Sequence, residues 1–78
     1  MEYLTLRADE VQPGDTWLCN SDDRVLVSSV EHTTDEAFAH HGMGIEVVRI
    51  SGKIIKGWGR GTKGTWTKLA SAAIEVTR

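Results

Sequence analysis

The chain has 78 residues, a formal net charge of −2 and a single cysteine, Cys19. A chain of this length predicts one domain, residues 1–78, that buries only about 60–65% of its potential surface and leaves little room for an enclosed active site. One cysteine excludes an internal disulfide and a paired-cysteine zinc module, and it favours a reducing, cytoplasmic location. No segment has the apolar length of a signal peptide core or a bilayer span, so we expect no membrane partner.

Charge is distributed unevenly along the chain. Residues 1–48 carry ten acids against two arginines, and residues 49–78 carry seven bases against Glu75. Two interpretations are open, since the basic half can bind a polar partner such as nucleic acid, or the two halves can attract each other within a Debye length of roughly 8–10 Å. The negative overall charge favours attraction between the halves.

The N-terminal part predicts short strands separated by turns. Residues 2–7 alternate apolar and polar side chains, which is the period-two pattern of a strand. Residues 11–15 contain a Pro-Gly pair typical of a turn, because proline fixes φ and glycine accepts a positive φ. Residues 15–19 and 24–32 then predict the two strands of a hairpin around the polar turn 20–23.

A short helix is predicted next. Residues 33–36 fit the S/T-x-x-E capping box, and residues 37–41, followed by Gly42, indicate one or two helical turns with a glycine stop. Such a segment is too short to be stable without tertiary contacts. Extension of the preceding strand is therefore the alternative.

The C-terminal part again predicts strands. Residues 45–50 and 53–58 flank Ser51 and Gly52, a compact connection that suits a tight hairpin. Apolar residues fall on both faces of this pair, as expected where a small barrel closes on itself. Residues 65–69 and 74–77 add further short strands.

These segments together predict an all-β fold, a small antiparallel barrel of five to seven short strands. Val11, Pro13, Gly14 and Asp15 follow the pattern V-x-P-G-D. This turn resembles the one that opens many SH3-like small barrels, including KOW-type modules of translation and transcription. The resemblance implies one barrel over the whole chain, and it concerns fold more than function. The compact chain is also similar in style to small accessory proteins of actinobacterial phages.

The candidate ligand site is a glycine-rich basic segment, residues 52–68, which contains two tryptophans and no acid. A hairpin over residues 53–69 with its loop centred on Thr62 would place Trp58 opposite Trp66 and Lys56 opposite Lys68. Cross-strand partners share a face, so these four side chains would lie together. The opposite face, with Ile55, Gly57, Thr65, Thr67 and Leu69, would then face the core. The predicted binding residues are Lys53, Lys56, Trp58, Arg60, Lys63, Trp66 and Lys68.

Three interpretations of this segment are open. Exposed indoles stack on the bases of single-stranded nucleic acid while cations follow the phosphates. Trp and Arg are also enriched at the hot spots of protein interfaces. Alternatively, both tryptophans fill the core, and a slip of one residue in register would exchange the faces. The acidic overall balance favours a protein partner over nucleic acid.

No other residues predict a catalytic centre. The set that resembles metal ligands comprises His32, His40, His41, Asp35, Glu36 and Cys19. Adjacent histidines point in different directions and no i, i+4 histidine pair occurs, so we interpret these histidines as solvated and keep metal binding as an alternative. We therefore expect a non-enzymatic module with no cofactor and no metal, either a monomer or a homodimer formed by edge-strand pairing.

Overall fold

The computed structural model describes residues 2–20, 22–40 and 43–78, and for residues 35–40 and 43–44 it describes only the backbone. Within these residues, six antiparallel strands form one sheet. Along the sheet the order is β1 (Tyr3–Arg7), β6 (Ala73–Thr77), β2 (Thr16–Leu18), β3 (Arg24–His40), β4 (Met43–Lys56) and β5 (Lys63–Leu69). A 3-10 turn, η1 (Ala8–Glu10), follows β1. The prediction of an all-β antiparallel fold is confirmed. No helix in the described residues is long and apolar enough to cross a membrane.

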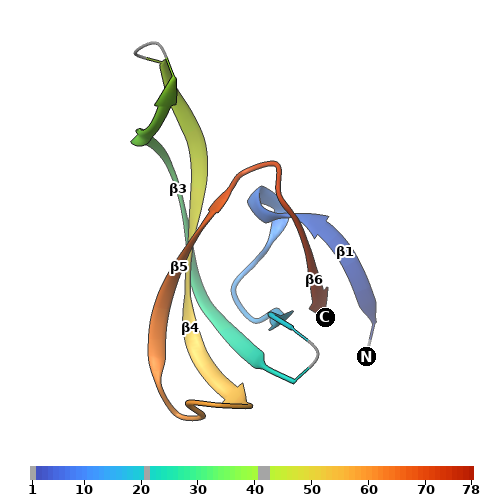
Figure 1. Cartoon of the computed structure of the whole chain (residues 1–78). Helices are drawn as coiled ribbons and strands as arrows, with labels where there is room; N and C mark the ends of the chain where they lie inside the picture. The colour runs from blue at the N-terminus through green and yellow to red at the C-terminus, as the bar shows by residue number, and fades with distance from the viewer. Residues whose placement is uncertain (1, 21, 41–42) are drawn as a thin grey trace.

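The sheet is strongly curled but open. In Figure 1, β1 and β6 lie side by side, and the β5–β6 connection crosses to them from the half that contains β3, β4 and β5. The backbone of η1 bonds to this connection, since Ala8 N–H donates to Ala72 O at 2.8 Å and Asp9 N–H donates to Ala70 O at 3.1 Å. No ladder joins the two edge strands β1 and β5 within the described residues, so the prediction of a closed barrel is wrong.

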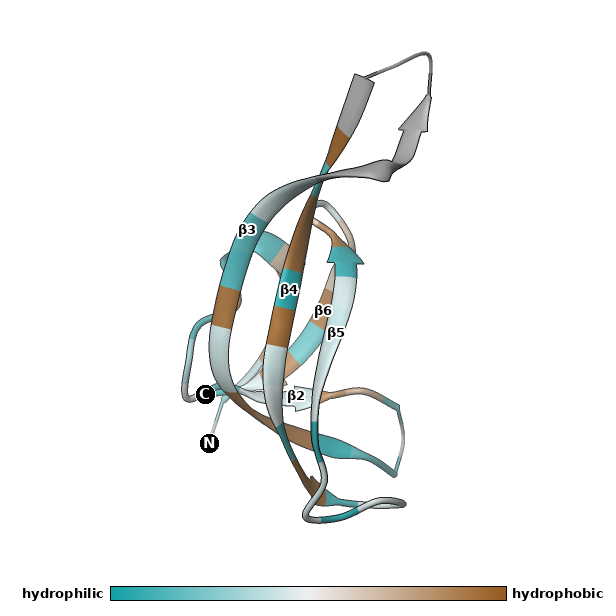
Figure 2. Ribbon diagram, turned by 90° about the vertical axis from the view of Figure 1, so that its left-hand side faces the viewer, coloured by the Kyte–Doolittle hydropathy of each residue, from teal (hydrophilic) through white to brown (hydrophobic). Residues whose placement is uncertain are grey.

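The core lies inside the curl. Hydrophobic and hydrophilic bands follow one another along β3 and β4 (Figure 2). The largest fully buried side chains include Val25, Val27, Val48, Ile50 and Val76. Trp17 of β2 is 5% exposed and is the largest side chain in this cluster. A domain this small depends on such a residue for much of its buried apolar area.

The turn at residues 11–15 is confirmed, and its acid has a structural role. Gly14 has a φ of +95°. The buried carboxylate of Asp15 accepts hydrogen bonds from Gln12 N at 2.9 Å and from two guanidinium nitrogens of Arg78, at 2.9 and 2.8 Å. The hydrogen bonds from Arg78 hold the pKa of Asp15 below its usual range. Asp15–Arg78 and the 3.6 Å pair Glu31–Arg49 join the acidic and basic halves of the chain.

The predicted helix after residue 32 is wrong, because β3 continues to His40. Thr33 pairs with Val47 and Asp35 pairs with Ile45, so the backbone of this segment bonds to β4. A helix of one or two turns lacks the internal hydrogen bonds to compete with such a ladder. Gly42, the predicted helix stop, lies outside the described residues.

The predicted tight hairpin at Ser51–Gly52 is also wrong, because β4 runs through both residues. Gly52 lies opposite Val27 beside an irregularity in the β3–β4 register. A Cβ atom on Gly52 would contact the carbonyl oxygen of Leu26 and lie 2.8 Å from a methyl group of Val25. This glycine therefore allows two strands to approach closely and does not form a turn.

Candidate binding site

The β4–β5 hairpin has a different register from the predicted one. Lys53 lies opposite Lys63 and Ile50 lies opposite Trp66, so the predicted pairs Trp58–Trp66 and Lys56–Lys68 are wrong. The chain reverses direction earlier than predicted, through three glycines with positive φ: Gly57 at +104°, Gly59 at +83° and Gly61 at +93°. Such φ values strain any residue with a Cβ, so the glycines determine where the turn forms.

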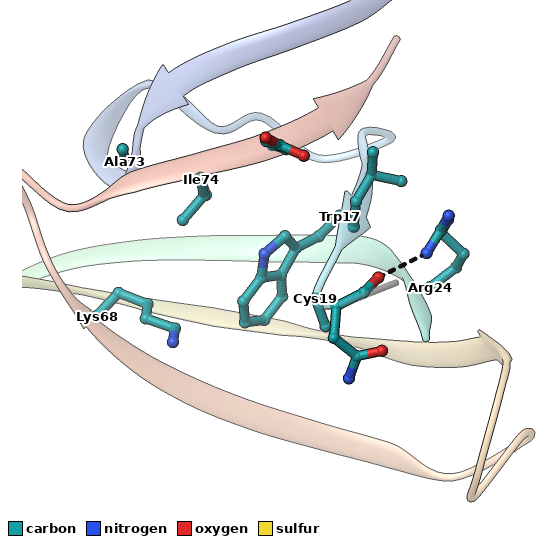
Figure 3. A pocket seen from close by; sticks show the side chains of 9 residues that line it. Trp17, Cys19, Arg24, Lys68, Ala73 and Ile74 are labelled. Carbon is teal, nitrogen blue, oxygen red and sulfur yellow. Dashed lines mark hydrogen bonds between the residues drawn. The ribbon is translucent and has the colours of Figure 1, made fainter. Parts of the chain in front are cut away.

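Trp66 and Lys68 of β5 share the inner face of the curled sheet. The half-buried Trp66 ring packs edge-on against Trp17, with ring centroids 5.6 Å apart and an interplanar angle of 83°. The Nζ atom of Lys68 lies 5.4 Å from the centroid of the Trp17 ring. Figure 3 shows Lys68 reaching toward Trp17. Trp66 is therefore part of the wall of the core.

Trp58 has the opposite environment and is 93% exposed at the tip of the hairpin. We call residues 57–62 the tip turn. Its backbone is bonded internally, because Arg60 N–H donates to Gly57 O at 3.3 Å and Thr62 N–H donates to Gly59 O at 2.9 Å, and it is bonded to β4 through Gly61 N–H, which donates to Ile54 O at 2.7 Å. The tip turn thus presents an indole to solvent from a hydrogen-bonded backbone.

The β2–β3 turn braces the tip turn. Asp23 Oδ1 accepts a hydrogen bond from the backbone N–H of Trp58 at 3.1 Å, and Asp23 Oδ2 accepts one from Asn20 Nδ2 at 2.7 Å. Asn20 Oδ1 in turn accepts the N–H of Asp22 and of Asp23. A Cβ atom on Gly57 would collide with the Asp23 carboxylate, so close contact between the two turns requires glycine there.

The cations of the hairpin are exposed around the tip turn, apart from the half-buried Lys68. Lys53 and Lys63 lie directly opposite each other, and Lys56 lies opposite Arg24. Like charges in such positions repel. Among the described residues the ion pairs join Arg7 to Asp9, Glu31 to Arg49 and Asp15 to Arg78, so none includes a lysine or arginine of residues 53–68. An anionic ligand would relieve this repulsion.

The two larger hollows beside the hairpin lie on opposite sides of it. The inner one has a volume of about 460 Å³ and lies between β5 and the β2–β6 half (Figure 3). Its lining includes Trp17, Cys19, Lys68, Ile74 and Glu75. Burial, helped by the charge of Asp23, raises the pKa of the Cys19 thiol. The outer one, about 560 Å³, is lined by residues that include Leu26, Ser28, Lys53, Lys63 and Thr65.

Most of the residues considered as metal ligands have side chains that the structure does not describe. Those of Asp35, Glu36 and His40 are not described, and neither is His41. Within the residues whose side chains are described, no group of three or more His, Cys, Asp or Glu residues is placed to hold a metal ion.

Comparison with protein-family models, curated proteins and solved structures found no match. The resemblance to SH3-like and KOW-type modules therefore stays a prediction. Sequence reasoning did not single out Trp17 or the contact of Asp23 with the tip turn. The strand pattern at residues 15–19 was the local signal that could have indicated a buried Trp17. The polar run at residues 20–23 indicated a turn capped by its own side chains, but not its contact with the tip turn.

Proposed function

We propose that the chain is a non-enzymatic binding module that holds a protein partner at the β4–β5 hairpin, with Trp58 as the anchor. The observation that carries the proposal is the 93% exposure of Trp58 on a hydrogen-bonded turn. Tryptophan is usually mostly buried, and it is the residue type most enriched at interface hot spots. A turn that is already ordered loses less conformational entropy when its partner binds.

The charges near Trp58 indicate the character of the partner. Lys53, Lys56, Arg60 and Lys63 lie in or beside the tip turn, and residues 52–68 contain no acid. Complementary charge around an interface steers encounter and excludes partners of like charge. An acidic surface on the partner protein fits this arrangement.

Single-stranded nucleic acid is the second candidate, and it is favoured by the cations of the hairpin, which form no ion pair with any side chain that the structure describes. Two features weaken it. Trp66 packs against Trp17, so Trp58 alone offers an indole face from this hairpin for stacking on bases. Lys68 lies on the inner face over Trp17, so the cations do not follow one track. A protein partner is therefore the better candidate.

The test compares two exposed aromatic residues. Tagged wild-type protein, a Trp58→Ala variant and a Tyr3→Ala variant are used to capture partners from a lysate of the source cells. Tyr3 is 73% exposed on β1, at the other edge of the sheet, and is the matched control. Loss of a hot spot worth about 2 kcal/mol weakens binding roughly 30-fold, and we expect this for Trp58→Ala alone. A specific partner that both variants retain equally would contradict the proposal.

The second candidate is tested by titration with short single-stranded oligonucleotides, followed by tryptophan fluorescence at low and at physiological salt. Binding to phosphates weakens steeply with salt, and charge-reversing variants Lys56→Glu and Arg60→Glu would abolish it. Absence of any response at low salt would eliminate the nucleic-acid candidate.

A further inference from the structure

Strand β5 is an edge of the sheet, and the hydrogen bonds at its two ends establish which way its backbone groups point. Ile54 N–H donates to Thr62 O at 2.9 Å, and Ala70 N–H donates to Glu46 O at 3.1 Å. Both bonds continue the β4–β5 register. Bonded pairs alternate along an antiparallel ladder, so the even-numbered residues of β5 bond to β4 and the odd-numbered residues point to the free edge.

The free edge of β5 is unoccupied over most of its length. In the part of the chain that the structure describes, the N–H and C=O groups of Lys63, Thr65 and Thr67 make no hydrogen bond on that side. At the far end, Leu69 O accepts a bond from Ala72 N–H at 2.9 Å, which closes the edge at the β5–β6 connection. The open edge therefore extends from Lys63 to Thr67.

The opposite edge of the sheet, β1, is shorter and partly closed. Glu2 N–H donates to Arg78 O and Ala8 N–H donates to Ala72 O, so Tyr3, Thr5 and Arg7 are the β1 residues that point outward. The N–H of Arg7 donates to Glu10 Oε1 at 3.0 Å and is not free. Of the two strands at the ends of the sheet, β5 therefore has the longer open edge within the described residues.

Charge selects the strand that can occupy this edge. Lys63 of β5 and Lys53 opposite it share the outer face of the hairpin. Lysine on an edge strand disfavours pairing with a second copy of the same strand, because like charges would meet. The same charges attract an acidic strand.

We propose that β5 is a β-augmentation site, at which an extended acidic segment of a partner protein adds as a seventh strand antiparallel to β5. The inference rests on the proposed protein-binding function and names the binding mode and partner chemistry at the same hairpin. Residues of the segment that bond to Lys63, Thr65 and Thr67 would share their outer face and place acids beside Lys63. The alternate residues would face inward beside Trp66, toward the hollow lined by Trp17 and Ile74, and are apolar.

The probe is a synthetic peptide with blocked ends that alternates Glu and Val over 7 residues, the length of β5. Amide exchange of ¹⁵N-labelled protein is followed by NMR as the peptide is added. We expect new protection at Lys63, Thr65 and Thr67 and no protection change at Trp66 and Lys68, which already bond to β4. Absence of binding, or protection elsewhere on the protein, would overturn the proposal.

Peptide controls separate strand pairing from charge alone. Methylation of the Glu backbone nitrogens removes the donors that face β5 and abolishes binding, whereas methylation of the Val nitrogens leaves binding intact. A peptide with Lys in place of Glu does not bind. Equal binding of the two methylated peptides would show that charge alone holds the segment and would overturn augmentation.

A pair of protein variants completes the test. Thr67→Pro removes a free N–H without removing a bond to β4, and Thr67→Val keeps that N–H while changing the side chain. Loss of one backbone bond weakens peptide binding by up to about tenfold in the proline variant and not in the valine variant. Lys63→Glu, which keeps the whole backbone edge, weakens binding as well and provides the test if the proline variant fails to fold.

Failure of this inference is distinguishable from failure of the proposed function. A partner that is lost with Trp58→Ala and bound normally by Thr67→Pro would overturn augmentation and leave the tip turn as the site. A peptide that protects β5 equally in wild type and in Trp58→Ala would support augmentation, whatever the outcome for the Trp58 anchor.

Discussion

Replacing each tryptophan by alanine should give three different losses of stability. Trp17 is 5% exposed, and removal of a buried Trp side chain costs about 3–5 kcal/mol. A chain of 78 residues has a total stability of roughly 4–12 kcal/mol, so Trp17→Ala removes about a quarter of it or more. Trp66 is half-buried and loses part of its burial energy together with its edge-on contact with Trp17, in total about 2 kcal/mol. Trp58→Ala changes stability by less than about 0.5 kcal/mol.

The assay is urea unfolding followed by far-ultraviolet circular dichroism, because this signal comes mainly from the backbone and each variant is compared with its own folded and unfolded baselines. The free energy of unfolding is compared for the wild type and the three variants. A loss of more than about 1 kcal/mol for Trp58→Ala would refute the reasoning, since a side chain in solvent has little burial energy to lose. Near-neutral behaviour of Trp17→Ala would refute it equally, because Trp17 is the largest side chain of the core.

Three further predictions concern the scaffold. Gly52→Ala forces a Cβ atom against the carbonyl of Leu26 and should cost about 1–3 kcal/mol in urea unfolding; an unchanged midpoint would mean that the strands are farther apart than described. The pKa of Asp15 is lowered by Arg78, so the stability it contributes is present above the usual aspartate pKa of about 3.9 and is lost as the pH falls through the lower native pKa. As the pH falls through that acid range, the melting temperature should decrease less steeply in Asp15→Asn than in the wild type. Identical slopes for the two proteins would contradict this prediction. Burial raises the pKa of Cys19 and so lowers its thiolate fraction at neutral pH. Alkylation of Cys19 by iodoacetamide should therefore be slower in the folded protein than in urea, and equal rates in the two conditions would contradict this prediction.

Local patterns predicted much of the sheet. The alternation at residues 2–7 and the Pro-Gly turn at 11–15 correspond to β1 and to the turn before β2, because side-chain period and backbone preference are determined by neighbouring residues. The polar turn at 20–23 was predicted for the same reason. Its Asp23 also contacts a turn more than 30 residues later, and no local pattern contains that information.

The errors arose where distant segments determine structure. A Ser-Gly pair is typical of a turn, yet Gly52 lies within β4, where the lack of a Cβ atom lets the backbone of β3 approach closely. The register of the β4–β5 hairpin follows from the positive φ of Gly57, Gly59 and Gly61, and several glycines of the segment could have formed the turn. Once that register changed, Trp58 and Trp66 no longer lay opposite each other. One joined the wall of the core, and the other is exposed at the tip turn.

The central claim is that the tip turn contacts a protein partner, and site-specific photocrosslinking tests it most directly. A photoreactive phenylalanine analogue is placed at position 58 in one variant and at position 3 in another, both of which are exposed. We expect light-dependent crosslinks to a discrete partner protein from position 58 and none from position 3. Crosslinks from position 3 alone, or to nucleic acid from position 58, would contradict the account.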